Sequence, residues 1–168
     1  TKTFFNPPEE MKSSCVPTEK LPDGILQGIV HDPLARLLGG VSGNAGLFSS
    51  AEDLALFAQM MLNQGQLEGV RILSPLSIRR MTEVFPLASF AGRGLGWDLS
   101  SAYASPRGDL FGPRSYGHTG YTGTSLWIDP ETQTFIILLT NRVHPENKGS
   151  VTSLRTRVAN IVAAAVLE

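Results

Sequence analysis

Apolar residues recur at helical spacing in the segment that begins at Ser50 and ends near Asn63. Its apolar positions are Leu54, Phe57, Ala58, Met61 and Leu62. This period of about 3.6 residues predicts an amphipathic helix with one face in the core. Ser50 is placed as the N-cap, Asp53 as its reciprocal capping-box partner, and Gly65 as the residue that ends the helix.

A shorter helix is predicted over residues 31–38. Asp32 is suited to the N-cap and Pro33 to the first helical position, and the pair Gly39-Gly40 breaks the helix. We expect its apolar face to consist of Leu34, Leu37 and Leu38.

Two more helices are predicted from the same signals. Ser74 and Pro75 begin a helix that reaches about Glu83, with Ile78 and Met81 turned inward. Residues 150–167 carry an apolar series at helical spacing, formed by Leu154, Val158, Ile161, Val162 and Ala165. We expect this last helix to pack on one face of a sheet.

From residue 94 the pattern favours strands, which we predict over residues 94–99, 115–122, 124–128 and 134–140, with a turn at Asp129-Pro130. Four prolines (Pro7, Pro8, Pro17 and Pro22) rule out a long helix or central strand in residues 1–27, which should wrap the surface. The pattern predicts an α+β fold, an antiparallel sheet with packed helices.

Composition and charge narrow the class of protein. The 168 residues, of which 42% are hydrophobic, are enough for one domain over 1–168. The 14 basic and 15 acidic residues form no stripe, so we expect no nucleic-acid partner. No apolar run approaches the roughly 20 residues of a membrane span. The single cysteine, Cys15, leaves the cellular compartment open.

No cofactor or metal site is expected. The glycines at 92, 94 and 96 fall short of a dinucleotide-binding fingerprint and precede a predicted strand instead of a helix. The three histidines, His31, His118 and His144, have no zinc-ligand spacing and lie beside no cysteine.

The strongest candidate for chemistry is the segment Gly117-His-Thr-Gly-Tyr-Thr-Gly-Thr124. Its three glycines allow a substrate to lie directly against the main chain. The hydrophobic run 134–140 follows and would anchor the segment in a core. The segment therefore predicts the wall of a pocket.

Five segments in this order resemble the C-terminal part of the serine hydrolases that include class C β-lactamases, D-alanyl-D-alanine peptidases and related esterases. They are residues 28–32, 39–54 and 94–98, the His-Thr-Gly element, and residues 139–145. The resemblance covers nearly the whole chain. It implies the C-terminal portion of the β-lactamase/transpeptidase-like fold, and it favours an extracytoplasmic location.

In that family the serine nucleophile and its base lie upstream, in Ser-x-x-Lys and Tyr-x-Asn motifs, and neither motif occurs in this chain. The sequence Ser42-Gly-Asn44 is similar to a Ser-x-Asn motif but stands in the wrong segment. Thr1 is not an initiator methionine and no signal pattern follows it. We therefore expect a C-terminal fragment, inactive alone, whose partner is the missing N-terminal segment of the same protein.

The resemblance also implies site residues. It places His118, Thr119, Gly120 and Tyr121 on the catalytic strand, with the Tyr121 amide as an oxyanion donor. His118 stands where many relatives carry a lysine that holds a substrate carboxylate. Substrate-binding positions at the cleft rim are His31, Asp32, Asn141 and Arg142. The expected substrate is a small acyl compound: a β-lactam, a D-amino-acid peptide or a carboxylic ester.

Plainer interpretations remain open. His118 could simply satisfy a strand edge, Asp32 is fully explained as a helix cap, and Arg142 could be a solvated charge. The chain could also be a non-catalytic binding or assembly module of the same fold. If upstream strands are absent, the apolar edge at residues 135–139 is unpaired, and we expect the chain to self-associate through it.

Overall fold

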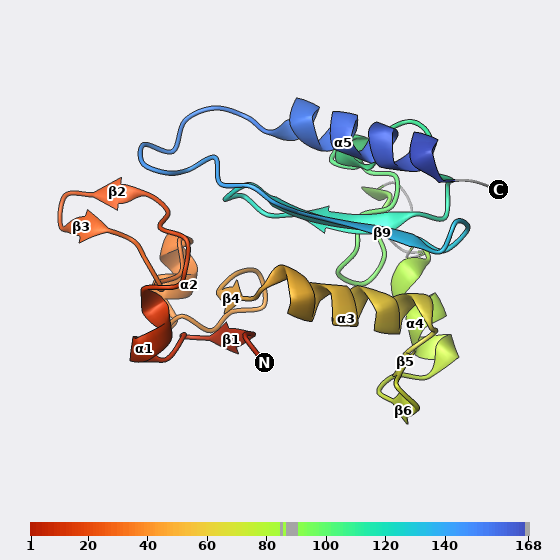
Figure 1. The fold of residues 1–168 in the computed structure, drawn as a ribbon, viewed down its shortest axis with the longest axis horizontal. Coiled ribbons are helices and arrows are strands. Elements are labelled where there is room, and N and C mark those ends of the chain that lie inside the picture. The colour runs from red at the N-terminus through yellow and green to blue at the C-terminus, as the bar shows by residue number, and fades with distance from the viewer. Residues whose placement is uncertain (85, 87–90, 167–168) are drawn as a thin grey trace.

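The computed structural model describes residues 1–84, 86 and 91–166 of the chain. At its centre lies a three-stranded antiparallel sheet of β7 (Tyr116–Thr119), β8 (Thr124–Asp129) and β9 (Thr134–Leu139), in that order. Helix α5 (Thr152–Ala165) covers one face of the sheet and α3 (Ala51–Leu62) the other (Figure 1). The predicted α+β fold is confirmed.

The core lies between α3 and the sheet. The fully buried side chains of Met61 and Ile128 pack there with Ile78 and Tyr116. Trp97 is buried in the same cluster. Trp97 contacts Tyr116 edge to face, with ring centroids 5.1 Å apart. The register places His118 opposite Leu126, which fixes the end of β7 against the middle strand.

Helix α3 begins as predicted, but its capping box does not form. The Ser50 side chain accepts a hydrogen bond from the Asp53 amide at 3.3 Å. The Asp53 carboxylate instead accepts from Thr1, from the Lys2 amide and from Thr3, at 2.6 to 2.9 Å. The reason is that β1 (Phe4–Phe5) pairs with β4 (Leu47–Phe48), which brings the first residues of the chain to the start of α3.

Helix α2 (Pro33–Leu37) has the predicted N-cap, but the face that it buries is not the predicted one. The Asp32 side chain accepts from the Ala35 amide at 2.7 Å. The predicted apolar face is wrong, because its three leucines are 59 to 84% exposed while Ala35 is fully buried. Arg36 ties the helix to its own flanking loop by donating to the carbonyls of Val30 and His31, and this turns Ala35 inward.

Helix α4 (Pro75–Thr82) is confirmed, with the Ser74 side chain accepting from the Ser77 amide at 3.0 Å and Ile78 buried. Helix α5 is confirmed in extent but rotated from the predicted face. Leu154 and Ile161 are 45% and 70% exposed, whereas Arg155 and Ala159 are buried.

Residues 94–99 do not form the predicted strand. The Gly94 amide bonds to the Trp97 carbonyl in a tight turn, and only single bridges join Arg93 to Asp98 and Asp98 to Gly117. Strand β7 is also shorter than the predicted 115–122, because the chain turns at Gly120, whose amide donates to the Thr124 carbonyl at 2.7 Å.

Several short elements carry no strong sequence signal. They are the helix α1 (Glu9–Lys12), the 3-10 helix η2 (Ser105–Arg107), and two hairpins, β2 (Lys20–Leu21) with β3 (Gly24–Ile25) and β5 (Gln66–Leu67) with β6 (Val70–Arg71). Helix α1 and the two hairpins lie away from the central sheet (Figure 1), whereas η2 contacts α5 and β7.

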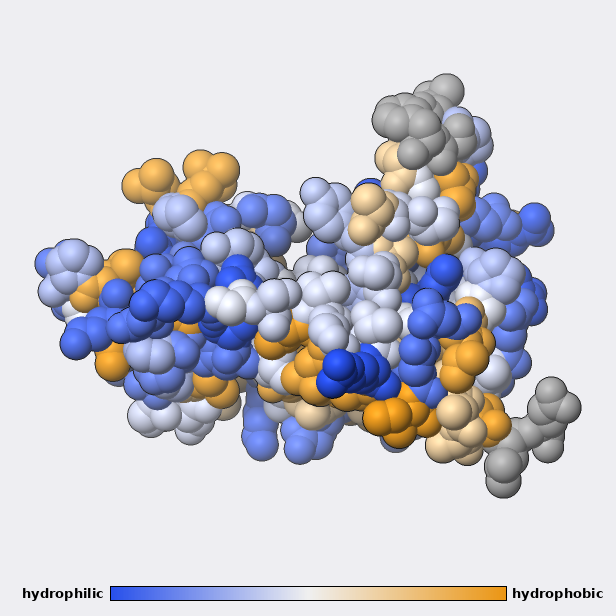
Figure 2. All heavy atoms as spheres, turned by 90° about the horizontal axis from the view of Figure 1, so that it is seen from above, coloured by the Kyte–Doolittle hydropathy of each residue, from blue (hydrophilic) through white to orange (hydrophobic). Residues whose placement is uncertain are grey.

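The surface carries separate apolar patches among polar residues, as Figure 2 shows from the α5 side. Within the described ranges, β9 is hydrogen-bonded to β8 on one side and to no strand on the other. None of the described helices is long and apolar enough to cross a membrane.

Candidate functional site

His118 stands at the end of β7 with its side chain exposed and both ring nitrogens engaged. Nε2 lies 2.7 Å from Nη2 of Arg93, and Nδ1 lies 2.9 Å from the carbonyl oxygen of Thr119. A guanidinium can only donate, so Nε2 must accept and Nδ1 must carry the proton and donate to Thr119. These partners assign His118 to the neutral form with the proton on Nδ1.

Arg93 links His118 to a buried carboxylate. Its Nη1 lies 3.8 Å from Oδ2 of Asp98, whose side chain is 5% exposed. The backbone of Asp98 in turn exchanges hydrogen bonds of 2.8 and 3.0 Å with Gly117. Among the described residues, Oδ1 of Asp98 has no hydrogen-bond partner. Asp98, Arg93 and His118 therefore form one charged and polar row along the end of β7.

Sequence reasoning missed Arg93 and Asp98. They flank the Gly94-Leu-Gly-Trp97 stretch, and a strand over 94–99 would have separated them. The tight turn instead places them across a single bridge. An arginine directly before a glycine-rich turn was the available signal.

The turn after β7 leaves two backbone amides, those of Tyr121 and Thr122, without a hydrogen-bond partner among the described residues. The Gly120 amide donates to Thr124, and the Gly123 amide donates to the Gly120 carbonyl at 3.1 Å. The Tyr121 amide makes no hydrogen bond within the described part of the chain. Gly123 has φ +129°, and a Cβ there would lie 2.6 Å from the Thr140 carbonyl oxygen. The turn therefore depends on glycine and leaves the N–H of Tyr121, the predicted oxyanion donor, unpaired among the described residues.

Arg155 binds this turn from the side of α5, and the sequence did not predict this contact. It is 8% exposed, and its Nη2 donates to the carbonyls of Gly120 at 2.9 Å and Thr124 at 2.7 Å. Desolvation first, and the charge of Arg142 second, lower the pKa of the Arg155 guanidinium. An arginine one turn before Ala159 on α5 was the only sequence signal.

Tyr121 gathers two of the predicted rim residues. Its ring stacks on His31 with centroids 5.5 Å apart, and Cζ of Arg142 lies 4.1 Å from the Tyr121 ring centroid. Nε of Arg142 also donates to the Tyr121 carbonyl at 2.7 Å. Hydrogen bonding with Asn147 first, and then with Arg142, lowers the pKa of the Tyr121 hydroxyl. His31, Tyr121 and Arg142 thus form one cluster at the end of β7.

The side chains of the other two predicted rim residues, Asp32 and Asn141, form hydrogen bonds to the backbone. Asp32 caps α2. Asn141 donates to the Pro17 carbonyl at 2.6 Å and accepts from the Val143 and His144 amides at 3.2 Å. Thr119, by contrast, is half-buried, and its hydroxyl makes no hydrogen bond to the described residues. Thr119 therefore has a hydroxyl without a partner among the described residues beside the turn.

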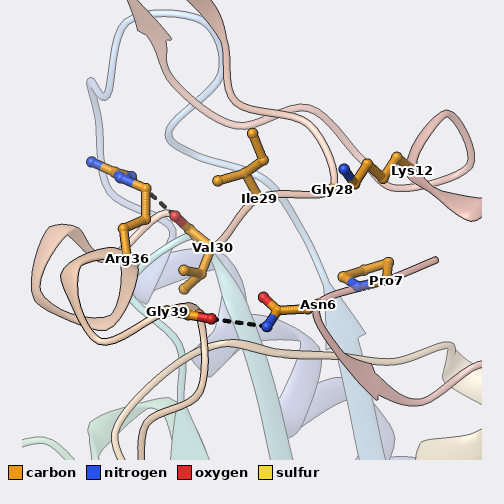
Figure 3. A pocket seen from close by; sticks show the side chains of 9 residues that line it. Asn6, Pro7, Lys12, Gly28, Ile29, Val30, Arg36 and Gly39 are labelled. Carbon is orange, nitrogen blue, oxygen red and sulfur yellow. Dashed lines mark hydrogen bonds between the residues drawn. The ribbon is translucent and has the colours of Figure 1, made fainter. Parts of the chain in front are cut away.

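A separate hollow lies between the first residues of the chain and the loop that leads into α2. It has a volume of about 380 Å³ and is lined by Asn6, Pro7, Lys12, Arg36 and residues 28–30 and 39–40 (Figure 3). The Asn6 side chain bridges to the Gly39 carbonyl at 2.8 Å. Neither the row of Asp98, Arg93 and His118 nor the cluster of His31, Tyr121 and Arg142 lines this hollow, so we do not identify it with the candidate site.

The Ser42-Gly-Asn44 stretch makes a local contact only, from Ser42 Oγ to Asn44 Oδ1 at 2.5 Å. In the described ranges, no group of three or more His, Cys, Asp or Glu side chains is arranged to hold a metal ion.

Comparison with known proteins shows the family to which the chain belongs. The family model described as Beta-lactamase matches residues 1–160. Two proteins named "Putative D-alanyl-D-alanine carboxypeptidase", from Salmonella paratyphi B and Salmonella newport, are each 43% identical over 122 residues, which is 71% of this chain. The matched region is 28% of each of those proteins, so the chain spans a minor part of their length.

A crystal structure of a β-lactamase from Mycobacterium bovis has the same fold over most of the chain. The TM-score is 0.57 at 22% identity, covering 80% of this chain and 54% of that one. At this identity the likeness concerns the fold alone. The match of the family model over residues 1–160 decides the assignment: this chain belongs to the β-lactamase family.

Proposed function

We propose that this chain forms the oxyanion strand and one cleft wall of a serine acyl hydrolase, with peptides that end in D-alanyl-D-alanine as the first substrate class. The observation that carries the proposal is the unbonded Tyr121 amide, which directly follows His118-Thr-Gly120 in a glycine-dependent turn. The names of the Salmonella relatives support the substrate class. β-Lactams and carboxylic esters remain the alternatives.

In this reaction a serine oxygen, from outside this chain, attacks the acyl carbon. Negative charge then develops on the carbonyl oxygen, and a fixed N–H donor such as that of Tyr121 stabilises it. The leaving amine takes a proton and departs, and water later cleaves the acyl-serine ester. The contribution of the Tyr121 amide is greatest in the transition state, where the charge is largest.

Arg93 and His118 together would recognise an anionic group of the substrate. His118 is neutral in its present contacts, so the positive charge of the pair comes from Arg93, which is half-exposed and has its Nη2 2.7 Å from Nε2 of His118. Arginine can bind a carboxylate through two parallel hydrogen bonds. The pair would thus serve the purpose that lysine serves in the relatives which the sequence resembles.

A second candidate function is a binding or assembly module without catalysis. It is favoured by the edge of β9 that pairs with no strand within the described ranges. Such a module would bind through the sheet edge and would form no acyl-enzyme.

The test uses the full-length protein in which this chain occurs. Incubation with a fluorescent penicillin and with a fluorophosphonate, followed by intact-mass analysis, should give one covalent adduct. Release of D-alanine from a peptide ending in D-alanyl-D-alanine should follow saturation kinetics. Absence of both adducts and of product would reject catalysis and favour the binding module.

A further inference from the structure

Arg155 is a buried cation that the chemistry above does not use. It lies on the face of α5 that packs on the sheet, whereas Arg157, two residues later, is exposed. Its Nη2 donates two hydrogen bonds, and both end on the turn between β7 and β8. Its Nε is buried without a partner among the described residues. Burying a charge that is only partly paired lowers the stability of the fold. We therefore look for the advantage of a buried Arg155 in the turn that it binds.

One of the two acceptors belongs to the peptide unit that carries the candidate oxyanion donor. The Gly120 carbonyl and the Tyr121 N–H are parts of the same planar trans peptide, so they point in opposite directions. Arg155 binds that carbonyl at 2.9 Å and the Gly123 amide binds it at 3.1 Å. The two bonds therefore direct the Tyr121 N–H away from α5.

Without these bonds the peptide unit would be easy to rotate. Gly120 has no side chain to hinder rotation, and glycine adopts both signs of φ readily. A flip would turn the Gly120 carbonyl toward the cleft and replace a donor by an acceptor. The second bond of Arg155, to Thr124 at 2.7 Å, ties the far side of the turn to the same guanidinium.

The charge of Arg155 should also make the Tyr121 N–H a stronger hydrogen-bond donor. A charged donor on a carbonyl polarises the peptide unit, and hydrogen bonds in such a chain strengthen one another. The effect is larger in a buried environment of low dielectric constant. The Tyr121 N–H should then be a better donor than an ordinary exposed amide.

We propose that Arg155 is a positioning residue that orients and polarises the Gly120–Tyr121 peptide so that its N–H serves as the oxyanion donor. The inference rests on the proposed function, because it assumes that an oxyanion forms beside Tyr121. Arg155 touches no reacting atom itself and acts through the backbone of the turn.

The test compares three variants of the full-length protein: Arg155→Met, which keeps the length and removes the charge, Arg155→Lys, which keeps the charge, and Arg157→Met as an exposed control on the same helix. We expect Arg155→Met to lower kcat about 10- to 100-fold with little change in KM, since loss of a whole oxyanion donor costs about 10²–10³ in kcat. Arg155→Lys should recover part of the loss, and Arg157→Met should stay within about twofold of wild type.

Two further readouts separate positioning from general stability. The affinity for a boronate transition-state analogue should fall by the same factor as kcat/KM. The infrared carbonyl band of the acyl-enzyme should move to higher frequency in Arg155→Met, as expected when the oxyanion donor is lost. All measurements are made at a temperature where thermal unfolding shows the variant to be folded.

The outcomes are distinguishable. A folded Arg155→Met protein with wild-type kcat and an unshifted carbonyl band would overturn the role of Arg155 and leave the hydrolase proposal standing. A loss that merely follows the unfolded fraction would overturn it as well. A wild type that forms no acyl-enzyme would overturn the proposed function, and this inference with it.

Discussion

Nη2 of Arg93 lies 2.7 Å from Nε2 of His118, and this contact fixes the imidazole as an acceptor on that side. The other nitrogen is committed to the Thr119 carbonyl at 2.9 Å. In this state His118 has no ring nitrogen free to move a proton. We therefore expect His118 to act by orienting Arg93 and the end of β7.

His118→Ala should therefore lower kcat/KM of the full-length protein by about 10- to 100-fold, the equivalent of about 1.5–3 kcal/mol for a hydrogen bond to a charged group. His118→Gln, whose side-chain oxygen can accept from Arg93, should lose less. Steady-state kinetics on a D-alanyl-D-alanine peptide measure both. Wild-type kinetics in His118→Ala would remove the residue from the site.

Arg93→Gln should raise KM for substrates that carry a free carboxylate and should leave KM for the corresponding methyl esters nearly unchanged. The reason is that arginine attracts the carboxylate, whereas glutamine keeps only a neutral hydrogen bond. Arg114→Gln is the matched control, because Arg114 is exposed and pairs with Glu131 at 2.8 Å. An equal rise in KM for both substrate types would contradict carboxylate recognition by Arg93.

Gly117→Ala should destabilise the protein by about 1–3 kcal/mol or more through overpacking. A Cβ at this position would lie 2.3 Å from Cδ2 of Trp127 and 2.4 Å from the Leu126 carbonyl oxygen. Gly43→Ala is the control, since a Cβ there meets no heavy atom within 4 Å. Urea unfolding of the two variants measures the difference, and equal midpoints would show that β7 can shift to make room.

Tyr116→Phe should change how stability depends on alkaline pH. Tyr116 is 3% exposed, and burial raises its pKa to about 12. The folded state favours the neutral form of Tyr116. The contribution of this preference to the free energy of unfolding is therefore fully present below the ordinary tyrosine pKa of about 10, and it is lost as pH rises toward 12.

Between pH 10 and 12 the free energy of unfolding of the wild type should thus fall relative to Tyr116→Phe, by up to about 2–3 kcal/mol. Denaturant titrations at several pH values measure this difference, with Tyr103→Phe as an exposed control, because Tyr103 is 72% exposed. Parallel pH curves for wild type and Tyr116→Phe would contradict the burial effect.

The 168-residue chain expressed alone should self-associate through the free edge of β9. Unpaired strand edges with apolar side chains promote pairing with other chains. Leu139→Lys, at a 45% exposed position of β9, should reduce this association, whereas Leu37→Lys on α2, at an 84% exposed position, should not. Size-exclusion chromatography with light scattering measures the mass, and a monomer at high concentration for the unmodified chain would refute the edge mechanism.

Much of the secondary structure could be predicted from the sequence because its causes are local. Ser50, Asp32 and Ser74 each cap the helix that follows by bonding an amide three residues ahead. A side chain and an amide so close in the chain meet whatever the rest of the fold does. The antiparallel order of β7, β8 and β9 follows in the same way from short connections.

Helix orientation could be predicted only in part. Periodicity marked Leu154 and Ile161 as the buried face of α5, but the helix buries Arg155 instead. The two hydrogen bonds of Arg155 to the β7–β8 turn depend on where that turn lies, and hydrophobic spacing contains no information on it. A similar error on α2 came from counting leucines without the polar bonds of Arg36.

The sequence by itself determined helices α2, α3, α4 and α5 and the three central strands, since each depends on neighbours within a few residues. Only the tertiary structure decided where β7 ends, which leaves the Tyr121 amide in a turn, and which side chains surround that turn. Arg93 reaches His118 across 25 residues of sequence, and Arg155 reaches Gly120 across 35. Such contacts are set by strand register and helix packing, which bring distant residues together only after the whole sheet has formed.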